Sequence, residues 1–136
     1  MVDGFASMMQ TYGVFIERVK DIHRLGALQG HLGWDQETIM PSKGSDARSD
    51  ILSWLAAERH ERLTDPEMGQ MLDSLEQEQE LDADQRANVR EMRRAYDKAI
   101  KLPSEFVAAF AKAKSEALLS WQKARQNSDF ESFQPQ

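Results

Sequence analysis

The chain has 136 residues, which is enough for one domain or for part of one. Hydrophobic residues make up 40% and charged residues 29%, a balance that favours a folded chain over a disordered one. The net charge of −6 argues against nucleic-acid binding, and the absence of cysteine excludes disulfides and thiolate zinc sites.

The sequence also bears on location. Residues 1–5 lack the basic and apolar regions of a secretory signal, and no run approaches about 18 apolar residues. We therefore expect a cytoplasmic protein with neither membrane nor nucleic-acid partners.

The first predicted helix runs from about Phe5 to about Gln36. Its apolar residues recur at steps of three and four: Met8, Tyr12, Phe15, Val19, Ile22, Leu25, Leu28 and Leu32. Four glycines interrupt it, which suggests close approach of a neighbouring helix or local kinks: Gly13, Gly26, Gly30 and Gly33. Pro41 has no N–H and restricts Met40, so the helix should stop just before it.

The second predicted helix begins after a cap at Ser42 or Ser45 and runs to about Leu63. Its apolar stripe, with Trp54 beside it, is Ala47, Ile51, Leu52, Leu55 and Ala56. A short third helix, roughly 66–79, follows an Asp65 cap with Pro66 at its first position. Its apolar residues are Met68, Met71, Leu72 and Leu75.

Asp82 caps the fourth predicted helix, which ends at Leu102-Pro103 and has Val89, Met92, Tyr96 and Ile100 as its stripe. The fifth opens at Ser104, and its apolar residues are Phe106, Val107, Phe110, Ala113, Ala117, Leu118, Trp121 and Ala124. No alternating β pattern is present. The sequence therefore predicts an all-α fold: one domain over residues 1–136, an antiparallel bundle of three long helices plus one or two short ones.

Charge is unevenly distributed along the chain. Residues 64–85 contain eight acidic side chains and no basic ones, whereas the fourth helix carries Arg86, Arg90, Arg94 and Lys98 at steps of four. We interpret the two regions as a solvated acidic hairpin beside a basic helix face, with weak pairing between them. A phosphate-binding stripe is the alternative, which the net acidity disfavours.

A search for catalytic groups finds none. His60-Glu61 begins like the zinc motif H-E-x-x-H, but the residue four positions after His60 is Thr64, so the motif fails. His23 and His31 lie about 12 Å apart along a helix, too far to share a metal. We interpret the three histidines as surface or capping residues and assign no catalytic, cofactor-binding or metal-ligating residue to this chain.

The segment before the second helix, Trp34-Asp35-Gln36-Glu37-Thr38 with Met40-Pro41, begins a series of ordered landmarks. The later ones are Arg48, His60-Glu61, Thr64-Asp65-Pro66, Asn88-Val89-Arg90, Arg93, Tyr96, Leu102-Pro103, Trp121, Ala124-Arg125, Asp129-Phe130, Phe133 and Pro135. In this order they resemble the N-terminal region of the carboxypeptidase Taq family, the thermostable zinc metallocarboxypeptidases. The resemblance covers nearly the whole chain, from about Tyr12 to Pro135.

The resemblance implies the N-terminal part of a neurolysin-like metallopeptidase fold, a helical segment that walls or lids the substrate cleft. Family members are much longer, and their zinc motif lies beyond the matched region. Zinc and a peptide substrate are therefore implied only for the full-length protein, and this chain alone is expected to be inactive. Six motif positions are expected to be structural: Trp34, Asp35, Gln36, Met40, Pro41 and Arg48.

Two hypotheses remain. The chain is a segment of a metallocarboxypeptidase that removes C-terminal residues from peptides, or it is a free-standing helical interaction module.

In either case we expect Trp34 to be buried at the junction of the first two helices, with Asp35 accepting hydrogen bonds from backbone N–H groups or from Arg48. We also expect a homodimer, because the helices carry more bulky apolar groups than they bury among themselves. These groups are Phe5, Phe15, Trp54, Phe106, Phe110, Trp121, Phe130 and Phe133.

Overall fold

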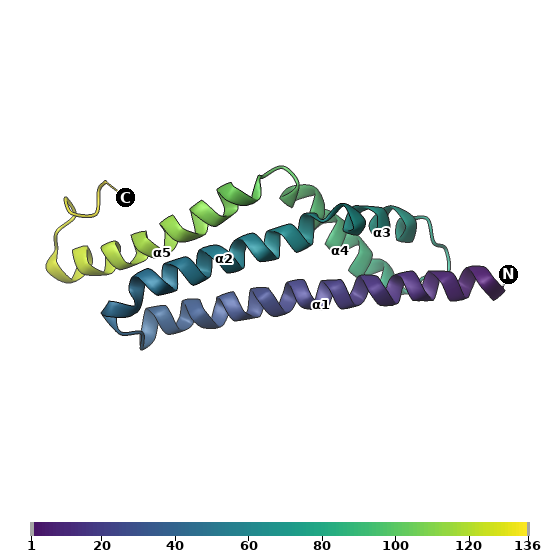
Figure 1. Cartoon of the computed structure of the whole chain (residues 1–136), viewed down its shortest axis with the longest axis horizontal. Coiled ribbons are helices and arrows are strands. Elements are labelled where there is room, and N and C mark those ends of the chain that lie inside the picture. The colour runs from purple at the N-terminus through teal and green to yellow at the C-terminus, as the bar shows by residue number, and fades with distance from the viewer. Residues whose placement is uncertain (1, 136) are drawn as a thin grey trace. The chain divides into compact units, whose positions relative to one another are not determined.

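The computed structural model describes the backbone of residues 2–135 and the side chains of residues 6–135. It contains helices and, within these residues, no strand (Figure 1). The helices are α1 (Val2–Thr38), α2 (Ser45–Thr64), α3 (Pro66–Glu76), α4 (Ala83–Ala99) and α5 (Ser104–Asn127), with a 3-10 turn, η1 (Ser42–Gly44), before α2. The predicted all-α fold is confirmed, and α1, α2 and α5 are the long helices, with 37, 20 and 24 residues.

The predicted helix ends are confirmed to within a few residues, because local chemistry sets them. The Asp65 side chain accepts a hydrogen bond from the Glu67 N–H and so caps α3, with Pro66 at its first position. Asp82 and Gln85 form a reciprocal capping box at the start of α4. The predicted third helix was three residues too long, since α3 ends at Glu76.

The helices divide between two compact units. Unit 1 comprises Met1–Gly26 and Arg59–Pro103, and unit 2 comprises Ala27–Glu58 and Ser104–Gln136. Both α1 and α2 contribute to each unit, whereas α3 and α4 belong to unit 1 and α5 belongs to unit 2. The single domain over residues 1–136 stays a prediction.

Unit 1 has an apolar core that matches the predicted stripes of its helices. The core consists of Met8, Phe15, Val19, Ile22, Met68, Leu72, Leu75, Leu81, Val89 and Met92. α3 packs closely on α4 at Gly69, where an added Cβ would lie 2.5 Å from the hydroxyl oxygen of Tyr96. Close approach of a neighbouring helix therefore occurs at Gly69. Of the four glycines of the first helix that suggested close approach or local kinks, Gly26 would place a Cβ 3.3 Å from Nε of Arg59 on α2, whereas Gly13, Gly30 and Gly33 have nothing within 4 Å of such a Cβ.

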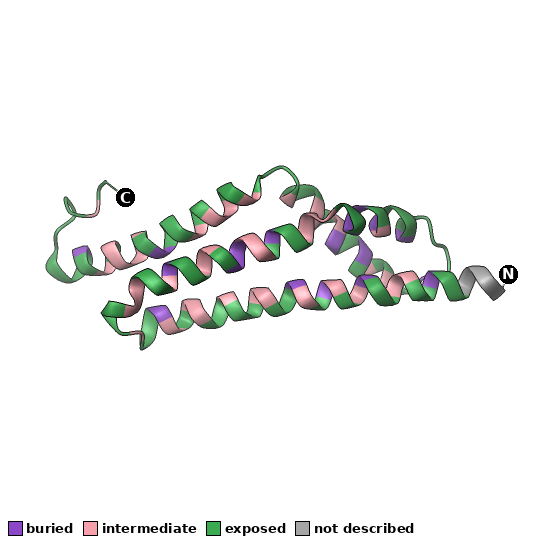
Figure 2. Ribbon diagram, viewed as in Figure 1, coloured by how far each residue is buried: buried purple, intermediate pink, exposed green. Residues whose placement is uncertain are grey.

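Unit 2 is built differently, with small and polar side chains at its centre. Its buried residues are Gln36, Ser49, Leu55, Ala56, Ser115 and Ala124. Exposed positions are frequent on all three of its helices and on the segment after α5 (Figure 2), and large apolar side chains occupy several of them. These side chains are Leu28, Trp34, Ile39, Ile51, Trp54, Phe106, Phe110, Trp121 and Phe130.

The predicted stripe of α5 is the main error in the sequence-based fold. Phe106, Phe110, Ala113 and Trp121 were expected to face the core, but they are exposed, and the buried side of α5 carries Ser115 instead. The helix is apolar on two sides, so its periodicity did not single out the inner one.

Among the described helices, none is both long enough and apolar enough to cross a membrane.

Candidate functional site

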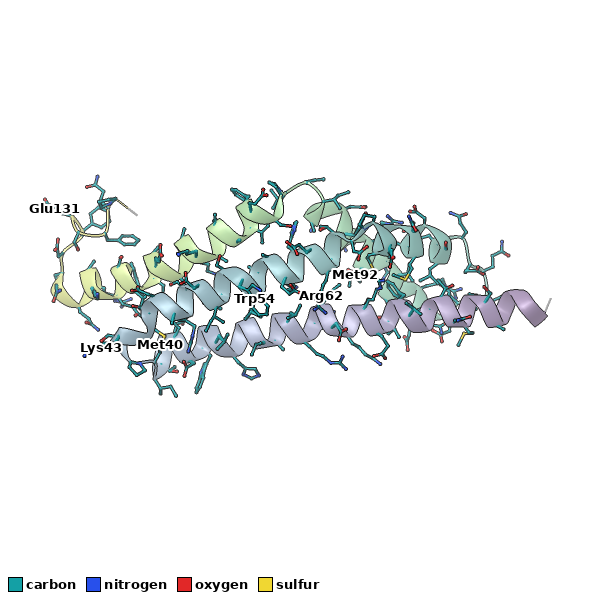
Figure 3. All side chains as sticks on the ribbon, in the orientation of Figure 1. Met40, Lys43, Trp54, Arg62, Met92 and Glu131 are labelled. Carbon is teal, nitrogen blue, oxygen red and sulfur yellow. The ribbon has the colours of Figure 1, made fainter. Side chains whose placement is uncertain are left out.

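The segment from Trp34 to Pro41 comprises the end of α1 and the residues that lead to η1 and α2; Met40, within it, and Lys43, two residues after it, are labelled in Figure 3. The backbone N–H groups of Ile39 and Met40 both donate to the carbonyl oxygen of Asp35, at 3.1 and 2.9 Å, and thereby close the end of α1. Pro41 begins η1 with φ −59°, the value its ring imposes. The predicted stop before Pro41 is confirmed, since α1 ends at Thr38.

Asp35 binds the start of α2. Its carboxylate accepts a hydrogen bond from Nη2 of Arg48 at 2.5 Å, while Nη1 of Arg48 donates to the carbonyl oxygen of Leu32 at 2.5 Å. The Arg48 side chain is only 14% exposed, so this ion pair is shielded from water. The expected Asp35–Arg48 interaction is confirmed, and it holds α1 and α2 together at their junction.

Gln36 reaches the third helix of unit 2. Its Nε2 donates to the hydroxyl oxygen of Ser115 at 2.8 Å and to the backbone carbonyl of Ser115 at 3.2 Å. The Ser115 hydroxyl donates to Oε1 of Gln36 at 3.2 Å and lies 2.9 Å from the hydroxyl of Ser49. All three side chains are buried, and their hydrogen bonds connect α1, α2 and α5. Ser49 and Ser115 were not predicted, because no local pattern marks a serine whose partners lie 66 and 79 residues away.

Trp34 does not lie in the core. Its side chain is 63% exposed, so the predicted burial at the helix junction is wrong. On α1 it precedes the inward-facing Asp35 and Gln36, and the turn of the helix points it away from them. The motif thus has two functions in this structure: Asp35 and Gln36 connect helices, and Trp34 presents an apolar surface.

The histidines are placed as surface and capping residues, as predicted. His23 and His31 are exposed. His60 is buried, and its Nε2 lies 3.0 Å from the carbonyl oxygen of Ala99, the last residue of α4. Thr64, where a zinc motif would place its second histidine, instead donates its hydroxyl to the His60 carbonyl at 2.8 Å. These residues do not fit a zinc site, and the described residues hold no group of three or more His, Asp or Glu suited to a metal.

Arg93 on α4 pairs with the acidic hairpin, and the expected weakness of this pairing stays a prediction. Arg93 donates to Asp73 at 2.5 Å and to Glu76 at 3.1 Å, and these hydrogen bonds outweigh the desolvation by burial and raise the pKa of Arg93. In unit 2, Lys112 on α5 donates a hydrogen bond to Asp50 on α2 at 2.8 Å. This hydrogen bond raises the pKa of Lys112. Arg86, Arg90 and Arg94 are exposed.

Comparisons with known proteins agree with this geometry. Thermostable carboxypeptidase 1 of Thermus thermophilus is 35% identical over 127 residues, which make up 91% of this chain and 25% of that protein. A solved structure named Trypanosoma Cruzi Metallocarboxypeptidase 1 is 34% identical with a TM-score of 0.71, covering 93% of this chain and 26% of that one. A crystal structure named BsuCP has a TM-score of 0.88 at 24% identity, also over 93% and 26%, and shows the same fold.

The fold and the sequence identity thus define a segment similar to part of metallocarboxypeptidases. The family model described as Carboxypeptidase Taq (M32) metallopeptidase matches residues 14–136, and the chain belongs to this family. The resemblance noted in the sequence is therefore confirmed. The chain spans about a quarter of the length of the curated relatives it matches.

Proposed function

We propose that this chain is the N-terminal helical segment of a zinc metallocarboxypeptidase that removes C-terminal residues from peptides. In this proposal the segment walls or lids the substrate cleft, and the zinc ligands and the catalytic base come from the rest of the protein. The bound metal would supply an activated water molecule. No step of that chemistry is assigned to a residue of this chain.

The observation that carries the proposal is that the family model matches residues 14–136 of this chain. The chain covers about a quarter of the length of its curated relative. The structure adds a physical reason for assigning a supporting role to this segment. Asp35 binds Arg48 on α2, and Gln36 binds Ser115 on α5. Two adjacent motif residues of α1 therefore connect three helices. The wall of a substrate cleft must be held rigidly, because a displacement of about 1 Å at a catalytic site already lowers the rate strongly.

A chimera tests the proposal. The matched quarter of the Thermus thermophilus enzyme is replaced by this chain, and hydrolysis of a blocked dipeptide and zinc per chain after dialysis are measured. We expect the chimera to bind zinc and to release the C-terminal residue, whereas the 136-residue chain alone does neither. Turnover with near-stoichiometric zinc in the isolated chain would contradict the proposal, as would an inactive chimera that is folded and loaded with zinc.

For the isolated chain we further propose a homodimer formed through exposed apolar side chains of unit 2. Of the groups named from the sequence, Phe15 is buried and Phe133 is half-buried, and the side chain of Phe5 lies outside the described residues. Trp54, Phe106, Phe110, Trp121 and Phe130 remain exposed. The same surfaces support the alternative function, a free-standing helical interaction module. Light scattering at micromolar concentration distinguishes a dimer from a monomer of 15.6 kDa.

A cytoplasmic location stays a prediction, which cell fractionation tests.

A further inference from the structure

The outer side of α5 carries exposed aromatic side chains that the junction motif does not explain. Its residues recur at steps of three and four along one side of the helix, opposite the buried Ser115: Phe106, Phe110, Ala113, Ala117 and Trp121. Ala117 is half-buried, and Ala124, at the C-terminal end of the same side, is buried and is not part of this set. We call this set the α5 outer face. Phe106 and Phe110 are 52% and 63% exposed, and their rings stack on each other with centroids 6.2 Å apart.

The charges of α5 lie at the two edges of this face rather than on it. By helical periodicity, Lys112, Glu116 and Lys123 form one edge, and Lys114 and Arg125 form the other. A surface helix usually turns its charges toward water and its apolar residues toward the core. A helix with apolar residues on two opposite sides and charges between them is typical of an element that is covered from both sides.

We propose that the α5 outer face is the surface on which the remaining three-quarters of the carboxypeptidase chain packs. This inference rests on the proposed function. Two observations favour that occupant. The relatives extend over four times the matched length, so a large part of the protein that could cover the face lies outside this chain. Between Phe106 and Trp121 the face runs for about 22 Å, long enough to seat another helix.

Charge argues against the packing of α5 on α5 of a second copy, so the dimer proposed for the isolated chain would place α5 against a different apolar surface of unit 2. The helix carries four basic residues and two acidic ones, a net charge of +2: Lys112, Lys114, Lys123, Arg125, Glu105 and Glu116. Glu105 and Glu116 balance Lys112 and Lys123 on one edge, whereas the edge with Lys114 and Arg125 is wholly basic. Two α5 helices packed with their basic edges together would place like charges side by side, which is unfavourable. The segment that packs on α5 is therefore expected to pair an apolar stripe with acidic residues beside it.

Cysteine labelling tests this inference, since the chain has no cysteine of its own. Ala113→Cys places one thiol on the α5 outer face, and the matched control Lys114→Cys places one on the adjacent edge; both positions are exposed. Each variant is made in the isolated chain and in the Thermus thermophilus chimera with all other cysteines removed. The rate of reaction with a small maleimide is then measured at several protein concentrations.

In the chimera we expect Ala113→Cys to react at least about tenfold more slowly than Lys114→Cys at every concentration. In the isolated, dilute chain the two rates should agree within about threefold. Equal rates in a folded chimera would overturn this inference but not the proposed function, and protection that disappears on dilution would assign the face to a second copy. A chimera without a cooperative thermal transition would instead count against the proposed function.

Discussion

Arg48 donates to the carboxylate of Asp35 and to the carbonyl oxygen of Leu32, so one guanidinium binds two positions one turn apart near the end of α1. The carbonyl of Leu32 lies near the helix C-terminus, where a positive charge is favourable. Arg48 itself lies in the first turn of α2, where its charge gains nothing from the dipole of its own helix. The position of Arg48 is therefore explained by its partners on α1.

Replacing Arg48 by Met should lower the free energy of unfolding by about 2 kcal/mol, because a shielded carboxylate and a carbonyl lose their charged donor. Urea denaturation of the isolated chain measures the change. Arg48→Lys keeps the charge but not both hydrogen bonds, and it should cost less. A change below about 0.5 kcal/mol for Arg48→Met would mean that the pair contributes no more than an ordinary surface ion pair.

Replacing Trp34 by Ala should cost less than about 1 kcal/mol in the isolated chain, because most of the indole is already in contact with water. Phe15→Ala is the matched large-to-small control. Phe15 is fully buried in the core of unit 1, and its loss should cost about 3–5 kcal/mol. Thermal and urea unfolding of the two variants are compared with the wild-type chain. Similar losses at both positions would show that Trp34 is covered.

Replacing Ser115 by Ala should destabilise the chain by about 1–3 kcal/mol, because Gln36 and Ser49 would keep buried polar atoms without their hydroxyl partner. Ser74→Ala, on the exposed surface of α3, is the control and should change the stability by less than about 0.5 kcal/mol. If Ser115→Ala and Ser74→Ala unfold at the same urea concentration, the buried network does not stabilise unit 2.

Replacing Gly69 by Ala should lower the free energy of unfolding by about 1–3 kcal/mol, because the new methyl group displaces the Tyr96 ring from its place against α3. Gly13→Ala provides the opposite control. Its added methyl group meets nothing within 4 Å, and the higher helix propensity of Ala should stabilise the chain by about 0.5–1 kcal/mol. Thermal unfolding followed by circular dichroism gives both signs, and a stabilising Gly69→Ala would contradict the tight packing.

The helix boundaries could be predicted because the residues that set them act locally. Pro41 ends one helix through its own ring, and Asp65 and Asp82 begin two others through backbone groups two or three residues away. The core of unit 1 was predicted for a related reason. Each of its helices has one apolar side, so the period of the sequence identifies which side faces inward.

The interior of unit 2 could not be predicted in the same way. On α5 the side with the aromatic residues looks more like a core than the side with Ser115, and only the positions of Gln36 and Ser49 decide between them. Trp34 was misplaced for the same reason, since its size suggested burial within this chain. Sequence patterns reveal which surfaces are apolar, but not which residues, if any, cover them.

The change of interior along α1 has a consequence for how the helix opens. Phe15 to Ile22 lie in an apolar core, whereas the same helix beyond Gly26 depends on a few buried hydrogen bonds and an ion pair. Backbone amides exchange with deuterium through local opening, and the segment with fewer buried apolar contacts opens more often. In the isolated chain, α1 should therefore exchange slowly around Val19 and markedly faster from Ala27 to Thr38, although no break in the helix separates the two stretches.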